Sequence, residues 1–233
     1  MKTLEKLLTE NRMPHDQSPR ENPGNGLHGL KDLCDDHVTK DTVMAEIGCF
    51  RGASTELFAM HCKKIFAIDP WGLIVSEGAV DPRGYALDHR IDMRIWGGGD
   101  AVQEVFEDRM SHYDNVEIIK GFSVSVAEQF RDESLDLVYI DGNHARKEVK
   151  ADMLAWYPKI KHGGVLCGHD YGSHHVKKGI ELWEEETGMK FQRQPRRGRG
   201  YRDGSWRLVV DEQVGAHMGH VHFVDSNVEL KNE

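Results

Sequence analysis

Short apolar runs alternate with amphipathic stretches along most of the chain, beginning near residue 41. Each apolar run has five or six residues, which is the usual length of a buried strand. The stretches between them repeat apolar residues every three or four positions, as helices that cover a sheet do. This pattern predicts strands at residues 42–47, 64–69, 116–120, 135–140 and 164–168.

Helices are predicted after these strands, at 53–62, 100–112, 125–130, 145–157 and 176–186. Two further strands are expected at 189–193 and 205–210, joined by an Arg/Gly-rich turn. Strands that alternate with helices form βαβ units with a mostly parallel sheet. The predicted fold class is therefore α/β. It is a doubly wound sheet of seven strands, mostly parallel, with an antiparallel terminal hairpin.

Three regions follow from where this alternation begins and ends. Residues 1–38 form an N-terminal helical extension, interrupted by prolines, that we expect to serve as a lid. Residues 39–210 form the main domain, and residues 211–233 form a polar C-terminal tail. Residues 71–99 carry no clear periodicity, and so long a connection inside a domain is usually functional.

The composition narrows the classes of protein that this chain can belong to. It has 39 Asp and Glu against 30 Lys and Arg, for a formal net charge of -9, which argues against binding a nucleic-acid backbone. No apolar run approaches the roughly 20 residues that span a bilayer, and the N-terminus shows no secretion signal. We expect a cytoplasmic protein with neither a membrane nor a nucleic-acid partner.

The cysteines agree with this location. None of the four lies in a C-x-x-C pair, and they stand at Cys34, Cys49, Cys62 and Cys167. We expect reduced thiols that are mostly buried in the core. A disulfide framework is the alternative, although such frameworks are typical of short secreted chains.

A glycine turn follows the first predicted strand. Gly48 and Gly52 permit a tight turn with close backbone approach to a ligand. Asp69 ends the next strand about twenty residues later, where a carboxylate can bind both hydroxyls of a ribose. Phe50 stands where a dinucleotide-binding turn has its second glycine, and its side chain would crowd a diphosphate. A nucleoside without phosphates fits better. A turn that binds nothing is the alternative.

Two groups of segments resemble a known family. AEIGCFRGAST at residues 45–55, with IDPW at 68–71, resembles class I S-adenosylmethionine-dependent methyltransferases. YIDGNH at 139–144 and GGVLCGHDY at 163–171 resemble a branch that includes small-molecule and sugar O-methyltransferases, some of them metal-dependent. The resemblance covers about residues 40–210. It implies a Rossmann-like fold.

The resemblance also implies S-adenosylmethionine as the cofactor. Adenine lies after the third strand in such folds, so Phe122 or Ser123 is expected to line its pocket, although a plain turn there is the alternative. The residues expected to bind the cofactor are Glu46, Gly48, Gly52, Asp69, Ser123 and Asp141.

Methyl transfer to an alcohol requires removal of the hydroxyl proton, and histidine suits that role at neutral pH. Asp141 and His144 lie at and just past the end of the fourth predicted strand, where ligands bind in open α/β sheets. In the resembling sugar methyltransferases a histidine at this motif position is the general base. We therefore expect His144 and Asp141 to be catalytic. The alternative is that His144 only caps the following helix.

A divalent metal, Mg²⁺ or Mn²⁺, is a further expectation from the metal-dependent relatives. Their ligand set maps onto Asp141, His169 and Asp170. Position 169 is a histidine here rather than an acid, and Mg²⁺ prefers oxygen ligands. This difference leaves open a softer ion such as Mn²⁺, or no metal.

The function expected from these residues is methyl transfer from S-adenosylmethionine to an oxygen of a small hydroxylated acceptor, with a sugar as the best candidate. The partner is then this small molecule, and a homo-oligomer is left open. Three alternatives remain. They are an NAD-dependent oxidoreductase on a similar sheet, a nucleic-acid-binding or nucleic-acid-methylating protein that uses the arginines of the 193–202 turn, and a diverged relative without activity.

Overall fold

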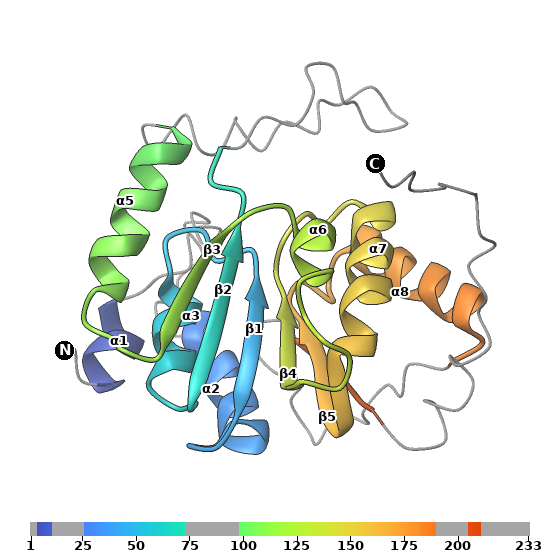
Figure 1. Cartoon of the computed structure of the whole chain (residues 1–233), viewed down its shortest axis with the longest axis horizontal. Helices are drawn as coiled ribbons and strands as arrows, with labels where there is room; N and C mark the ends of the chain where they lie inside the picture. Colours follow the sequence, from blue (N-terminus) through green and yellow to red (C-terminus); the bar gives the residue numbers. More distant parts are fainter. Residues whose placement is uncertain (1–3, 11–25, 73–97, 190–204, 211–233) are drawn as a thin grey trace, which may run out of the picture.

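A computed structural model describes residues 4–10, 26–72, 98–189 and 205–210 (Figure 1). Several predicted features lie outside these residues. They are most of the 71–99 connection, residues 190–193 of the strand expected at 189–193, the arginine-containing turn at 193–202, and the tail at 211–233. The predictions made for them stay predictions.

The described strands form one sheet with the order β3-β2-β1-β4-β5-β6. The first five are parallel to their neighbours, and the last is antiparallel to β5. The predicted mostly parallel α/β sheet is confirmed. The strands are β1 (Val43–Ile47), β2 (Lys64–Asp69), β3 (Val116–Lys120), β4 (Leu135–Ile140), β5 (Ile160–Gly168) and β6 (Trp206–Val209).

The described residues contain six of the seven predicted strands, and the remaining one, expected at 189–193, lies outside them from residue 190 onward. The terminal strand β6 pairs antiparallel with β5, with Val209 opposite Val165 and Trp206 opposite Gly168. The antiparallel edge is therefore present. Of the strand expected at 189–193, only Met189 is described, and it directly follows the helix-ending residue Gly188, whose φ is 71°.

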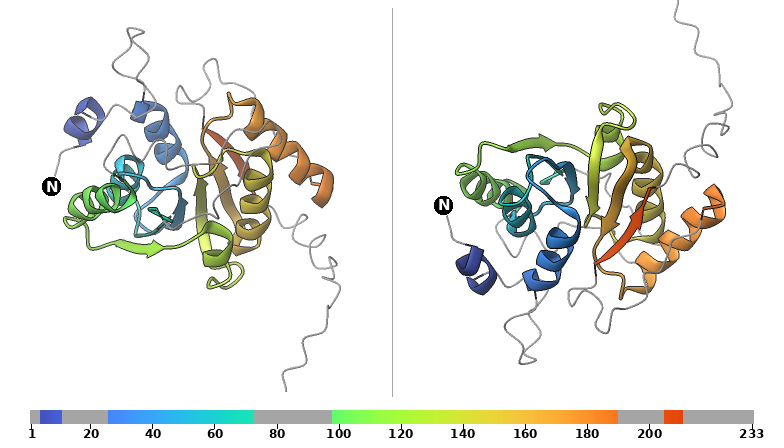
Figure 2. Two further views of the ribbon diagram at one scale, coloured as in Figure 1. Left: turned by 90° about the horizontal axis from the view of Figure 1, so that it is seen from above. Right: turned by 90° about the horizontal axis from the view of Figure 1, so that it is seen from below.

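Helices cover both faces of the sheet, as Figure 2 shows from above and from below. On one face lie α6, α7 and α8, and on the other lie α1, α2, α3 and α5. The helices are α1 (Leu4–Glu10), α2 (Gly26–His37), α3 (Ala53–Ala59), α5 (Gly99–Met110), α6 (Ser123–Ala127), α7 (Arg146–Trp156) and α8 (His174–Thr187), with a 3-10 turn at Tyr157–Lys159.

Neighbouring strand residues face opposite layers, as the pleat of a strand requires. Met44 and Leu137 are buried against α1, α2 and α3, whereas Ala45 and Val138 are buried against α6, α7 and α8. Because both faces are covered, the central strands read as continuous apolar runs rather than as alternating ones. This is why the sequence pattern located them.

The N-terminal helices belong to this packing. Leu7 of α1 and Leu30 of α2 are buried in the same cluster as Met44 and Phe58. The boundary between residues 38 and 39 and the lid role of the extension stay predictions. None of the helices in the described residues is long and apolar enough to span a membrane. All four cysteines are free and buried, as expected.

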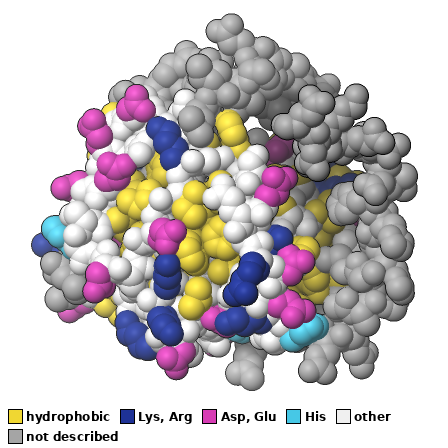
Figure 3. All heavy atoms as spheres, viewed as in Figure 1, with side chains coloured by type: hydrophobic (Ala, Val, Ile, Leu, Met, Phe, Trp, Pro, Cys, Tyr) yellow, Lys and Arg dark blue, Asp and Glu magenta, His cyan; other side chains and the backbone are white. Residues whose placement is uncertain are grey.

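Apolar side chains stay exposed around β3 and α6. Ile118, Phe122 and Val124 are among the exposed large hydrophobic side chains. Figure 3 views the molecule as in Figure 1 and shows hydrophobic side chains, in yellow, between charged ones. β3 is an edge strand of the described sheet, and α6 has only five residues. The described helices therefore leave this edge of the sheet incompletely covered.

The sheet places one set of chain segments where a ligand would bind. All five parallel strands end at the same edge, and the strand order changes direction between β1 and β4. In open α/β sheets ligands bind outside the carboxyl ends at this switch point. The loops after β1, β2, β4 and β5 meet there, and they carry most of the predicted site residues.

Candidate active site

The glycine turn after β1 lies directly against the loop after β4. Gly48 has a φ of 89°, and a β-carbon at this residue would lie 2.3 Å from the carbonyl oxygen of Asp141. Only glycine fits there, because both the backbone angle and the close contact exclude a side chain. The N–H of Gly48 donates to the carbonyl of Ile68, and that of Asp141 donates to the carbonyl of Ile47, both at 2.8 Å. These bonds join the ends of β1, β2 and β4.

Asp69 at the end of β2 lies beside this turn, as its position in the sequence indicated. Its side chain is held by two backbone donors. The Phe50 N–H donates to Oδ2 at 2.9 Å, and the Trp71 N–H donates to Oδ1 at 2.8 Å. The residue is only 5% exposed. Both carboxylate oxygens therefore fix the backbone around the turn.

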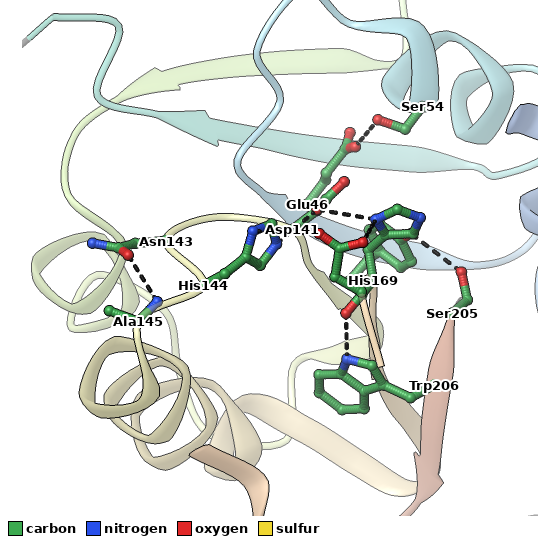
Figure 4. A network of polar contacts seen from close by, with 11 residues as sticks. Glu46, Ser54, Asp141, Asn143, His144, Ala145, His169, Ser205 and Trp206 are labelled. Carbon is green, nitrogen blue, oxygen red and sulfur yellow. Dashed lines mark hydrogen bonds and ion pairs between the residues drawn. The ribbon is translucent and has the colours of Figure 1, made fainter. Parts of the chain in front are cut away.

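Glu46 of β1 is completely buried next to the same turn. The Ser54 hydroxyl at the start of α3 donates to Oε1 of Glu46, as Figure 4 shows. Burial raises the pKa of Glu46 to about 7, and the Ser54 hydrogen bond limits the rise. The second oxygen, Oε2, is buried and has no hydrogen-bond partner among the described residues. A buried acceptor without a donor is unusual in a native protein.

Four side chains from the ends of β4 and β5 form one cluster, and Figure 4 labels three of them, Asp141, His144 and His169. His144 Nε2 lies 3.2 Å from Asp141 Oδ1, and His144 Nδ1 lies 3.5 Å from Asp170 Oδ2. His169 Nδ1 lies 3.6 Å from Asp141 Oδ1 and 3.3 Å from Asp170 Oδ1. The structure therefore brings together all four residues predicted for catalysis and metal binding.

The electrostatics of His144 suit a group that exchanges protons. Burial by itself would lower the pKa of His144, but the hydrogen bond to Asp141 and the charges of Asp141 and Asp170 outweigh it, so the pKa is raised. The His144 and Asp170 side chains are 32% and 42% exposed, so a ligand can reach both. The cluster combines a basic nitrogen with access from solvent.

The helix that follows does not use His144 as its cap. The Ala145 N–H donates at 2.9 Å to Oδ1 of Asn143, just before α7 begins at Arg146. Asn143 thus closes the turn at the start of the helix. His144 is left to face the two carboxylates, which favours the catalytic interpretation over the capping one.

The metal prediction gains no support from this geometry. No group of three or more His, Cys, Asp or Glu side chains is arranged to hold a metal ion within the described residues. His144 Nε2 and Asp141 Oδ1 form a hydrogen bond at 3.2 Å, whereas His169 Nδ1 is buried with no hydrogen-bond partner among the described residues. Asp141, His169 and Asp170 as arranged give the predicted divalent ion no support.

Ser123 at the start of α6 has protein partners of its own. The Trp156 indole N–H donates to its hydroxyl oxygen at 2.8 Å. Burial raises the pKa of Asp152 on α7 to about 7, and a hydrogen bond with Ser123 opposes part of this rise. The hydroxyl of Ser123 therefore ties α6 to α7, and its place after β3 is next to the exposed side chain of Phe122.

The sequence analysis assigned no role to three residues near the site. Asp152 occupies an inward position of α7 between Val149 and Trp156, where an acid at apolar spacing was the available signal. Trp206 of β6 donates its indole N–H at 2.9 Å to the carbonyl of His169, and Trp71 follows Asp69. Trp71 ends the IDPW segment but was assigned no role, and no motif marks Trp206, whose partner His169 is 37 positions away.

The chain matches one protein family by sequence and several solved structures by fold. A family model described as a methyltransferase domain matches residues 45–171. This segment contains the glycine turn, Asp69 and the four-residue cluster. A search of curated protein sequences finds no match to the chain.

Several solved structures are similar. The O-methyltransferase NovP matches with a TM-score of 0.55 at 16% identity, over 78% of this chain and 76% of its own. An rRNA methylase from Streptococcus thermophilus has a TM-score of 0.47 at 14% identity, over 71% of this chain and 81% of its own. Phosphoethanolamine N-methyltransferase 1 from Haemonchus contortus, solved with phosphoethanolamine and S-adenosylhomocysteine, has a TM-score of 0.45 at 15% identity, over 63% of this chain.

The chain spans only part of some of these structures. It covers 26% of the Haemonchus contortus enzyme and 50% of a Bacillus protein, YcgJ. At 16% identity the match with NovP shows a shared fold and not a shared acceptor.

Proposed function

Because the chain belongs to the methyltransferase family, whose domain spans residues 45–171, we propose that it moves a methyl group from S-adenosylmethionine to an oxygen of a small hydroxylated acceptor. Its fold is that of the class I enzymes that use this cofactor. The observation that supports an oxygen acceptor is the pairing of His144 with Asp141 and Asp170 at the ends of β4 and β5. An alcohol must lose a proton during methyl transfer, and this cluster supplies a base.

The cofactor would be held by the loops at the switch point. S-adenosylmethionine supplies a methyl group on a positively charged sulfur. Glu46 and Asp69 place two buried acids beside the turn, and Oε2 of Glu46 lacks a donor among the described residues, so both features suit a cationic ligand. We assign cofactor binding to Glu46, Gly48, Gly52, Asp69, Ser123 and Asp141.

The proton would leave the acceptor through His144. In its neutral form the imidazole donates its Nε2 hydrogen to Asp141, 3.2 Å away, which leaves Nδ1 unprotonated. Nδ1 faces Asp170, whose carboxylate is exposed and would stabilise the imidazolium formed when His144 takes the proton. Asp141 thus selects the tautomer and Asp170 balances the charge, a division of roles familiar from other histidine bases.

The acceptor is proposed to be a sugar or a comparable polyol. The O-methyltransferase NovP, named for the same reaction class, has the same fold. The proposal does not use a metal, because Asp141 and Asp170 already face histidine nitrogens. It also needs no nucleic acid, in keeping with the formal net charge of -9.

Binding titration tests the cofactor first. The full chain is titrated by calorimetry with S-adenosylhomocysteine and, separately, with NAD. We expect saturable binding of S-adenosylhomocysteine and none of NAD. Binding of NAD alone would replace the proposal with an oxidoreductase.

A radiolabelled transfer assay then tests the acceptor. The enzyme is offered labelled S-adenosylmethionine with sugars, catechols, amines and total RNA in parallel. Label in the sugars or other hydroxyl compounds supports the proposal. Label that appears only in amines or in RNA would contradict the oxygen acceptor.

A further inference from the structure

Trp71 stands at the junction of the glycine turn, β2 and α5. It is completely buried. Its indole N–H donates at 2.8 Å to the carbonyl of Phe50, and its backbone N–H donates at 2.8 Å to Oδ1 of Asp69. Its ring packs on Phe106 of α5, with 4.8 Å between ring centroids. One side chain therefore contacts the turn, the strand end and the helix.

The hydrogen bonds around Trp71 form a closed ring. Phe50 donates its N–H to Asp69, Asp69 accepts from Trp71, and the indole of Trp71 returns to the carbonyl of Phe50. We call these three residues the turn bridge. Because both the N–H and the C=O of Phe50 are engaged, the peptide planes on either side of this residue are fixed.

The turn bridge holds a strained backbone. Phe50 and Trp71 have φ values of 46° and 35°, in the left-handed region that side chains other than glycine rarely adopt. Such conformations persist only where the surrounding structure enforces them, and they concentrate at ligand sites. The hydrogen bond from the Trp71 indole to the Phe50 carbonyl helps to hold this left-handed conformation.

Close packing extends the bridge to α5. A β-carbon at Gly99, the first residue of α5, would lie 2.5 Å from the carbonyl oxygen of Trp71. A β-carbon at Gly52 would lie 2.9 Å from the ring of Phe106. The glycine turn, Trp71 and the start of α5 therefore pack without spare space, so a displacement of Trp71 would reach the turn directly.

We propose that Trp71 is a positioning residue for the cofactor, whose indole N–H holds the Phe50 carbonyl and with it the glycine turn in the conformation that binds S-adenosylmethionine. The inference rests on the proposed function, because it assigns the turn to that cofactor. Trp71 acts through Phe50 and Asp69. It sets the affinity for the cofactor and not the chemistry of the acceptor.

Replacing the indole with a ring that has no N–H separates this role from core packing. Trp71→Phe keeps an aromatic ring against Phe106 but removes the donor. We expect the Kd for S-adenosylhomocysteine to rise about five- to tenfold, since a lost hydrogen bond leaves a buried acceptor unsatisfied. At saturating cofactor, kcat and the KM for the acceptor should stay within about twofold of the wild type.

Trp183→Phe is the matched control. Trp183 is also completely buried and packs on Tyr157, with 5.4 Å between ring centroids, but its indole N–H has no acceptor among the described residues. The control removes the same atoms without breaking a hydrogen bond. It should leave the Kd for S-adenosylhomocysteine unchanged even where it lowers Tm as much as Trp71→Phe does.

Each result has one meaning. Wild-type affinity in Trp71→Phe, or equal weakening in Trp183→Phe, would overturn the positioning role while the proposed function stands. Failure of the wild-type protein to bind S-adenosylhomocysteine would overturn the proposed function itself. If Trp71→Phe does not fold, β-(3-benzothienyl)alanine placed at position 71 keeps the ring shape and removes only the N–H. Wild-type affinity in that variant would equally reject the inference.

Discussion

The two sides of the site are built differently. At the ends of β1 and β2, Glu46 and Asp69 are buried and receive hydrogen bonds from the chain itself. At the ends of β4 and β5, His144 and Asp170 are 32% and 42% exposed and face each other across 3.5 Å. The first arrangement fixes its two carboxyl groups in place, as a rigid binding site for one ligand would require. The second keeps ionisable groups accessible, as proton transfer to a bound acceptor requires.

The causes of the pKa shifts differ in the same way. For Glu46 burial is the dominant influence, and it raises the pKa to about 7. For His144 burial acts downward, and the neighbouring carboxylates outweigh it. Solvent exclusion therefore dominates the pKa shift of Glu46, on the side that we propose binds the cofactor, whereas charge pairing dominates that of His144, on the side that we propose binds the acceptor. Substitutions on the two sides should affect different measurable quantities.

The largest effect is expected from His144→Ala. It should lower kcat by at least about a hundredfold because the base is removed, while the Kd for S-adenosylhomocysteine stays unchanged. Steady-state kinetics and calorimetry measure the two quantities. His162→Ala removes a histidine paired with Glu133 near the start of β5 and serves as the control. Normal turnover in His144→Ala would assign the base to another residue.

Asp69→Asn should instead weaken cofactor binding, measured as the Kd for S-adenosylhomocysteine. An asparagine offers one acceptor oxygen, so either Phe50 or Trp71 would lose its acceptor and face an amide donor. An unsatisfied buried N–H costs about 1–3 kcal/mol, so the Kd for S-adenosylhomocysteine should rise at least about tenfold. Asp136→Asn, which alters an acceptor of the Val43 N–H at the other end of the sheet, is the control. Equal affinities in the two variants would argue against the assigned cofactor site.

Glu46→Gln tests whether the buried carboxyl group of Glu46 makes the stability of the protein depend on pH. Folding raises the pKa of Glu46 from 4.5 to about 7, so the folded state keeps a proton that the unfolded state releases in this range. Stability from this residue is complete below 4.5 and is lost as the pH rises to about 7. Glutamine does not titrate. The variant should therefore gain Tm relative to the wild type across this window, by roughly a few degrees.

Thermal unfolding followed by circular dichroism between pH 4 and 8 measures this difference. Asp152→Asn is the companion variant, since the pKa of Asp152 is also raised to about 7 by burial but the residue lies on α7. A difference between Glu46→Gln and the wild type that stays constant over the window would show that Glu46 does not titrate there.

The smallest effect is expected from a chelator. Within the described residues, no group of three or more His, Cys, Asp or Glu side chains is arranged to hold a metal ion, and Asp141 is hydrogen-bonded to His144. Activity in excess EDTA should therefore stay within about twofold of the untreated enzyme in the labelled transfer assay. Loss of activity that Mn²⁺ restores would show that Asp141, His169 and Asp170 rearrange to bind a metal, and that charge pairing alone does not govern this side of the site.

Much of the fold could be predicted because local pattern reports burial. The apolar runs located β1, β2, β3 and β4 within about a residue of their observed ends. For β5 only residues 164–168 were expected, whereas the strand begins at Ile160. Lys161, His162 and Gly163 extend it at an exposed end of the sheet, where pairing with β4 and the backbone bonds of Val210 stabilise a strand without apolar residues.

The sequence predicted which residues form the site better than it predicted how they contact one another. The residues at strand ends were identified because the carboxyl ends of parallel strands share one edge. Their hydrogen-bond partners were not identified. Asp69, for example, accepts hydrogen bonds from the backbone N–H groups of Phe50 and Trp71. Gly48 likewise makes room for the loop after β4, a contact that sequence spacing does not report.

The sequence by itself determined which residues sit at the ends of which strands, because hydrophobic periodicity and glycine positions act over short distances. The tertiary structure alone decided which ring nitrogen of His144 faces which carboxylate, and which donors Asp69 accepts from. It also brought Trp71 onto Phe50 and Phe106. The contacts of His144 with Asp170, and of Phe50 with Asp69 and Trp71, join residues about twenty or more positions apart. Their geometry follows from how the whole sheet packs against its helices.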